Sequence, residues 1–139
     1  MATEKELPPI LLVEDDPVDV ALFRRGLRIL RPRTDLSVAR DGDEAVEMLS
    51  DRRGERSPFS HVVLDLKLPK RSGLEVLEWI RGRADLREVR VVMLTSSQLQ
   101  PDVERARRAG LDRYFVKPPH FSGLLDVVRE ILKEWVLLP

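Results

Sequence analysis

Five short apolar segments recur along the chain, and after each of them the apolar residues fall at helical spacing. The first segment, residues 9–13 (PILLV), lacks polar alternation, which is typical of a strand buried on both faces of a parallel sheet. The second is a shorter, alternating segment around Leu36 and Val38. The other predicted strands are residues 61–64, 91–94 and 114–116.

Capping residues and prolines indicate where the helices begin and end. Asp16 followed by Pro17 is typical of an N-cap and a first helical turn, and Pro32 stops this first helix. Ser72, with Glu75 three residues later, predicts a capping box for the third helix. The other helices are expected to begin after Asp41-Gly42, near Pro101, and near Phe121 or Ser122.

The order of these elements predicts an α/β protein of five strand-helix units, (βα)5. Because crossover connections are right-handed, such a chain forms a doubly wound five-stranded parallel sheet with helices on both faces. A length of 139 residues is typical of a single domain, here 1–139 with a core from about 9 to 135. Residues 51–60 (DRRGERSPFS) are polar and predict a longer loop before the third strand.

Composition narrows the chemistry and the location. The formal net charge is zero, which gives no electrostatic reason to expect nucleic-acid binding. No apolar run is long enough to span a membrane, and residues 1–6 lack the features of a secretory signal, so we expect a cytoplasmic protein. The chain has no cysteine and only two histidines, so its chemistry is expected to come from carboxylates, hydroxyls and lysine.

Four of the predicted strands end in residues of these kinds. Glu14 and Asp15 follow the first strand, Asp65 the third, Thr95 the fourth and Lys117 the fifth. In an open α/β sheet the carboxyl ends of the strands lie at the edge where ligands bind. Three carboxylates within about 5 Å of one another repel by roughly 3 kcal/mol per pair at an effective dielectric near 20. We therefore expect a divalent cation such as Mg²⁺ among them.

A carboxylate beside a cation is a competent nucleophile toward a phosphoryl group, which makes Asp65 a candidate phosphoacceptor. The cation and Lys117 are expected to stabilise the charge that gathers on the transferring group. Thr95 can donate a hydrogen bond to a phosphate oxygen that is present only after phosphorylation. Because such a bond favours one state, the site can act as a switch.

The fragments LLVEDD, VVLDLKLP, GLEVL, VVMLTSS and AGLDRYFVKP resemble the receiver domains of two-component response regulators, over nearly the whole chain. The resemblance implies a flavodoxin-like sheet with strand order 2-1-3-4-5 and a phosphoacceptor at Asp65. It implies Mg²⁺, or Mn²⁺ or another divalent cation in its place. Asp15 would be a direct metal ligand, Glu14 a ligand through water, and Lys67 a ligand through its backbone carbonyl. By the same resemblance, Thr95 and Lys117 hold the phosphoryl group.

Further positions match or depart from this family. Tyr114 matches an aromatic position whose rotamer follows phosphorylation, and Lys117-Pro118 matches a peptide bond that is often cis. Glu14 stands where aspartate is common in the family, and its side chain is longer than that of aspartate. Lys67 and Ser97 each follow a site residue by two positions, and we hypothesise that they shape water access and phosphoryl lifetime.

The resemblance also implies partners. A stand-alone receiver without an output domain is a signalling protein rather than an enzyme, and it takes its phosphoryl group from a sensor histidine kinase. The loop at 51–60 and the ending WVLLP resemble the small regulators paired with bacterial phytochrome kinases, which implies a bacteriophytochrome partner. Residues 135–138 can pack on their own sheet or contact a second copy. We favour a homodimer through the last strand, the last helix and the C-terminal end.

Two other functions would need residues that this chain lacks, and some of the site residues could have simpler structural roles. A haloacid dehalogenase-type phosphatase would carry a second aspartate where Lys67 stands. A flavodoxin-like cofactor carrier would need a hydroxyl- and glycine-rich loop where residues 14–16 (EDD) would repel a phosphate. Thr95 could be a plain N-cap, and residues 14–16 could serve only to cap the first helix. A pseudo-receiver that is never phosphorylated remains the alternative that experiment must separate.

Overall fold

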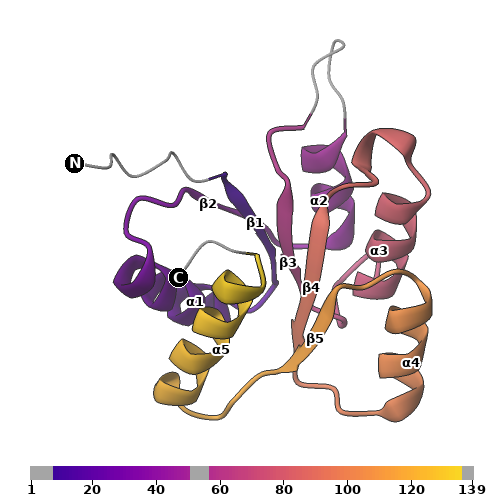
Figure 1. The fold of residues 1–139 in the computed structure, drawn as a ribbon. Helices are drawn as coiled ribbons and strands as arrows, with labels where there is room; N and C mark the ends of the chain where they lie inside the picture. The colour runs from indigo at the N-terminus through magenta and orange to yellow at the C-terminus, as the bar shows by residue number, and fades with distance from the viewer. Residues whose placement is uncertain (1–7, 51–56, 136–139) are drawn as a thin grey trace.

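Five parallel strands form one sheet, and helices cover both of its faces (Figure 1). The computed structural model of the chain describes residues 8–50 and 57–135. The strand order is β2-β1-β3-β4-β5, so the predicted fold and strand order are confirmed. The strands are β1 (Ile10–Val13), β2 (Leu36–Ala39), β3 (His61–Leu64), β4 (Arg90–Thr95) and β5 (Arg113–Val116).

Two groups of helices enclose the sheet. One face is covered by α1 and α5, and the other by α2, α3 and α4 (Figure 1). The helices are α1 (Pro17–Leu30), α2 (Gly42–Leu49), α3 (Gly73–Arg81), the short 3-10 helix η1 (Ala84–Leu86), α4 (Gln100–Arg108) and α5 (Phe121–Glu134). Within the described parts of the chain, no helix is both long and apolar enough to cross a membrane.

The central strands are buried on both sides, as their unbroken apolar runs predict. In β3, Val62 belongs to the cluster under α2, α3 and α4, whereas Val63 belongs to the cluster under α1 and α5. Alternate residues of one strand therefore fill two separate cores. This burial fixes the strand register, because a slip by one residue would exchange the two sets of side chains.

The predicted helix caps are also confirmed. The Asp16 carboxylate accepts a hydrogen bond from the Val18 amide at 2.8 Å, with Pro17 in the first turn. Ser72 and Glu75 form the predicted capping box of α3. These caps start α1 and α3 immediately after the loops that follow β1 and β3, where the site residues lie.

The largest difference from the sequence reading lies around Thr95. We predicted that the fourth strand would end at residue 94, but β4 extends through Thr95, which is paired with Val116 of β5. The N-cap of α4 is Leu99, which makes no side-chain capping bond. Thr95 is therefore not a helix cap. The loop predicted at 51–60 falls largely on residues 51–56, which lie outside the described residues.

Candidate functional site

The three predicted carboxylates converge at the carboxyl ends of β1 and β3. Backbone pairing continues one residue beyond each strand, since the Asp65 amide donates to the Val13 carbonyl at 3.1 Å. Carboxylate oxygens of Glu14, Asp15 and Asp65 all lie within 4.8 Å of one another. Glu14 and Asp65 are buried, with exposed fractions of 3% and 7%, whereas Asp15 is exposed. The cluster thus has two buried acids and one that faces solvent.

Lys117 reaches across the sheet from the end of β5 and binds this cluster. Its Nζ donates to Asp65 Oδ2 at 2.8 Å and to Glu14 Oε1. A third bond, at 2.9 Å, goes to Asp19 Oδ2 in the first turn of α1. The three N–H groups of the ammonium therefore have three carboxylate acceptors.

Asp19 is the site residue that the sequence reading missed. An acid in the first turn of a helix is ordinarily explained by the helix dipole, and this explanation needs no partner from elsewhere in the chain. The one available signal was spacing, because Asp15 and Asp19 are four residues apart where the chain enters α1. The link to Lys117 joins residues 98 positions apart, and local pattern carries no information about it.

Burial and charge shift the pKa values of this cluster in opposite directions. Burial, with a further contribution from the charge of Asp65, raises the pKa of Glu14 to about 7, although Lys117 acts against the rise. Burial also disfavours the charged form of Lys117, but hydrogen bonds to Asp65, Glu14 and Asp19 outweigh it and raise the lysine pKa. Lys117 therefore stays charged, while Glu14 binds a proton readily near neutral pH.

The donor set fits a hard divalent cation. Lys117 binds the carboxylates of Glu14, Asp19 and Asp65, and a fourth carboxylate, that of Asp15, lies near Glu14 and Asp65. This excess of negative charge, made entirely of oxygen donors with Asp15 open to solvent, suits Mg²⁺, which prefers a few carboxylates and several waters. The predicted acids Glu14, Asp15 and Asp65 lie together, and their roles as metal ligands stay a prediction.

Thr95 and Tyr114 belong to a second group of polar residues beside the carboxylates. Thr95 is fully buried, and the Ser97 amide points toward its Oγ1 at 3.5 Å. The Tyr114 hydroxyl donates to the Ser97 carbonyl at 2.8 Å, and Ser97 Oγ donates to Asp102 at 2.8 Å. Burial raises the pKa of Tyr114. The two predicted switch residues are therefore joined through the segment that connects β4 to α4.

The Lys67 backbone and the peptide bond between Lys117 and Pro118 also lie at this site. The Lys67 amide points toward Asp65 Oδ1 at 3.3 Å, which places the Lys67 backbone next to the phosphoacceptor candidate. Its proposed role as a carbonyl ligand stays a prediction. The described residues contain no cis peptide bond, so the bond between Lys117 and Pro118 is trans, unlike the isomer often found in the family that the sequence resembles.

A comparison with known families decides the classification. Residues 10–129 match the family described as response regulator receiver domain. The chain belongs to this family. The match covers all five strands and every site residue discussed above.

Two relatives are similar to this chain over most of its length. Response regulator Rcp1 from Synechocystis is 33% identical over 138 residues, covering 96% of this chain and 94% of Rcp1. The probable methanogenesis regulatory protein FilR2 from Methanothrix harundinacea is 38% identical over 128 residues, covering 91% of this chain and 83% of FilR2.

Solved structures give the same result. The phosphorylated cyanobacterial phytochrome response regulator RcpA has a TM-score of 0.83 at 29% identity, and Mn²⁺-bound Rcp1 has 0.82 at 32%, each covering 93% of this chain and 94% of the other. The bacteriophytochrome response regulator AtBRR is 40% identical with a TM-score of 0.71, covering 91% of this chain and 93% of AtBRR. The predicted resemblance to phytochrome-associated regulators is confirmed.

Proposed function

We propose that this receiver accepts a phosphoryl group on Asp65 from a sensor histidine kinase, in a reaction that requires Mg²⁺. One observation carries the proposal: Asp65 Oδ2 lies 2.8 Å from Lys117 Nζ within a cluster of three carboxylates. A nucleophilic carboxylate, a fixed cation and a metal-binding oxygen set are the parts that phosphoryl transfer to aspartate needs.

The proposed metal ligands are Asp15 and Asp65 directly, Glu14 through a water molecule, and Lys67 through its backbone carbonyl. When bound, Mg²⁺ would offset negative charge on the oxygens of the transferring group. The related Rcp1 structure is a Mn²⁺-bound form, which supports a divalent cation of this class.

In the proposed reaction a carboxylate oxygen of Asp65 attacks phosphorus. An acyl phosphate forms as the bond from phosphorus to the donor nitrogen breaks, and that nitrogen leaves with its electron pair. Lys117 already donates to Asp65, so a small movement lets it donate to a phosphoryl oxygen. The chain has Lys67 where a hydrolytic enzyme would have a second acid, which supports a signalling role rather than turnover.

Thr95 and Tyr114 are the proposed switch. A hydrogen bond from Thr95 to a phosphoryl oxygen would draw the end of β4 toward Asp65. Tyr114 is bonded to Ser97, two residues further along, so the same movement reaches β5 and the loop before α4. The switched surface would therefore lie around α4 and β5.

The proposed partners are a kinase and a second copy of the chain. Similarity to RcpA and AtBRR supports a bacteriophytochrome kinase as the partner. Because the regulator must meet the kinase where phosphoryl transfer takes place, we propose that it works in the cytoplasm.

For the homodimer we propose β5 and α5 as the contact. Among the described residues, β5 pairs with β4 alone, and Val116 of β5 is 37% exposed. Trp135 instead packs in its own domain against His61, with ring centroids 4.7 Å apart, and residues 136–139 lie outside the described residues.

Phosphorylation is tested with acetyl phosphate and Mg²⁺, followed by intact mass. The protein is expected to gain the mass of one phosphoryl group, Asp65→Asn to gain none, and a chelator to abolish labelling. Asp126→Asn is the matched control, because its exposed side chain on α5 pairs only with Arg129. An unlabelled wild-type protein, under conditions that label another receiver, would identify the chain as a pseudo-receiver.

Dimerisation is tested by sedimentation velocity at high protein concentration, with and without beryllofluoride as a phosphoryl mimic. We expect a dimer, and we expect Val116→Asp to shift the protein to a monomer because it places charge on the proposed contact. A wild-type protein that sediments as a monomer in both conditions would contradict the proposed contact.

A further inference from the structure

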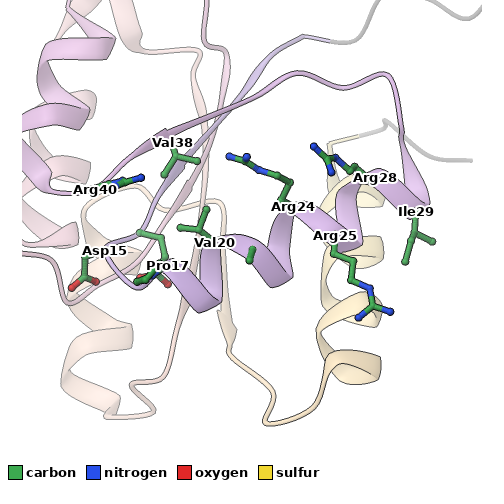
Figure 2. Close-up of a pocket in the computed structure, with 11 residues that line it drawn as sticks. Asp15, Pro17, Val20, Arg24, Arg25, Arg28, Ile29, Val38 and Arg40 are labelled. Atoms are coloured by element: carbon green, nitrogen blue, oxygen red, sulfur yellow. The ribbon is translucent and has the colours of Figure 1, made fainter.

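A groove runs along α1 beside β2 (Figure 2). Its volume is about 660 Å³, within the usual range for small-molecule sites of roughly 300–1,000 Å³. Apolar side chains form part of its lining: Pro17, Val20, Ala21, Ile29 and Val38. One end reaches Glu14 and Asp15, so the groove begins next to the carboxylate cluster.

Four of the residues that line this groove are arginines. Figure 2 shows Arg24 and Arg28 pointing from α1 toward β2, while Arg40 points inward from the residue after β2. Arg25, between them on the helix, turns the other way, and its guanidinium lies 4.4 Å from the centre of the Phe121 ring. Arg25 also lines the groove, but its guanidinium lies against Phe121, so Arg24 and Arg28 are the arginines of α1 that point toward β2.

Across the described residues, none of Arg24, Arg28 and Arg40 makes a side-chain hydrogen bond or ion pair. Arg24 Nε is buried and has no acceptor. A shielded N–H group without an acceptor is costly, and water cannot reach this atom to satisfy it. Arg24 and Arg28 are also like charges at i,i+4, an arrangement that disfavours the helix.

The nearby acids do not relieve this excess of positive charge. Glu14 and Asp15 line only the end of the groove nearest the sheet edge, and Glu14 already accepts from Lys117. They would also repel an anion at that end. An anionic group would therefore be held further along, between Arg24 and Arg28 on one wall and β2 on the other.

We propose that this groove is a binding site for a small organic phosphate, separate from the phosphoacceptor site. Guanidinium groups bind phosphate oxygens through paired N–H donors, and Arg24 and Arg28, one turn apart on α1, can hold one phosphate together. The apolar lining, which includes Val20 and Val38, would contact the organic part. A nucleoside diphosphate has this combination of charge and apolar surface. The proposal does not depend on phosphorylation of Asp65.

Calorimetric titration of the full chain tests the proposal, with ADP and inorganic pyrophosphate as probes and adenosine as the uncharged control. A chelator is present throughout, so that no metal can recruit phosphate to the carboxylates. We expect saturable binding of ADP and no binding of adenosine. Arg24→Gln and Arg28→Gln should each weaken ADP binding by at least about tenfold, because each removes a charged phosphate contact.

Arg25→Gln is the matched control, with the same substitution one position away on the same helix. It should change affinity by less than about twofold, because the Arg25 guanidinium lies against Phe121 instead of pointing toward β2. Asp65→Asn should bind ADP as the wild type does, while failing to be labelled by acetyl phosphate. If Arg24→Gln does not fold, Arg28→Gln still tests the site. Equal weakening in Arg25→Gln, loss of binding in Asp65→Asn, or binding of a polyglutamate peptide but not of ADP would each overturn the proposal.

Discussion

Replacing Lys117 with methionine is expected to slow labelling of Asp65 by acetyl phosphate by at least about a hundredfold, the usual effect of losing one donor that stabilises transition-state charge. Methionine keeps most of the length of the side chain but none of its charge. Asp65 and Glu14 have no other cation within ion-pair distance among the described residues. Labelling rates at saturating Mg²⁺ measure this effect on transfer separately from metal affinity.

The same substitution is expected to destabilise the metal-free protein by about 3 kcal/mol, because it leaves two buried carboxylates unpaired. The loss should depend on pH. The folded-state pKa of Glu14, about 7, lies above its ordinary value of 4.5, so the metal-free wild type already loses stability as pH rises through this interval. Without Lys117 that pKa rises further. The deficit should therefore be larger near pH 8 than near pH 6.

Thermal unfolding at both pH values, with and without Mg²⁺, measures this effect. Added Mg²⁺ should restore part of the stability of Lys117→Met, because it binds only the folded cluster. Lys133→Met is the control, since Lys133 is exposed near the end of α5. Asp19→Asn keeps the lysine and removes one acceptor, so its effect should be smaller. An unchanged stability of Lys117→Met near pH 8 would show that the carboxylates do not depend on the lysine.

Much of this site could be predicted because it is built at strand ends. The position of a residue after a buried apolar run fixes where it lies on a parallel sheet, so Glu14, Asp65 and Lys117 could be placed at one edge before their contacts were known. Burial on both faces also makes those runs easy to find. The helix caps Asp16 and Ser72 depend only on neighbouring residues, and both were predicted.

The features that were missed all depend on how a helix is placed against the sheet. Asp19 reaches Lys117 only because α1 packs beside the end of β5. The direction of Arg24 and Arg28 toward β2, opposite to Arg25, is likewise set by the rotation of α1 about its axis. Helical periodicity predicts which face of a helix is apolar, but it does not predict which element packs against that face. From the sequence, Trp135 could either pack on its own domain or contact a second copy. In the structure it is buried against His61, which gives it a role within the domain.

Replacing Gly73 with alanine is expected to destabilise the protein by about 2–4 kcal/mol, as overpacking of a tight contact does. Gly73 is the first residue of α3 and donates from its amide to the Leu66 carbonyl at 2.8 Å. A Cβ at this position would lie 2.0 Å from the Asp65 carbonyl oxygen and 2.8 Å from the Leu66 Cα. Both contacts are with backbone, so no side chain can move aside to relieve them.

The strain is expected to reach the proposed phosphoacceptor, Asp65. To admit the methyl group, either α3 must move away or the chain at Asp65 must shift, and the second response moves the carboxylate relative to Lys117. The folded fraction of Gly73→Ala should therefore be labelled by acetyl phosphate at least about tenfold more slowly than wild type, since small errors in the position of a reacting group are costly. Urea unfolding measures the stability, and labelling at low temperature measures the rate.

Gly26→Ala is the matched control, because it makes the same substitution in an uncrowded part of a helix. Gly26 lies within α1, and a Cβ there would be 3.5 Å from Val128 Cγ2, an ordinary contact. Alanine in a helix interior should raise stability by about 0.5–1 kcal/mol and leave labelling unchanged. If Gly73→Ala were instead as stable as Gly26→Ala and labelled at the wild-type rate, the close approach of α3 to the end of β3 would not be what positions Asp65.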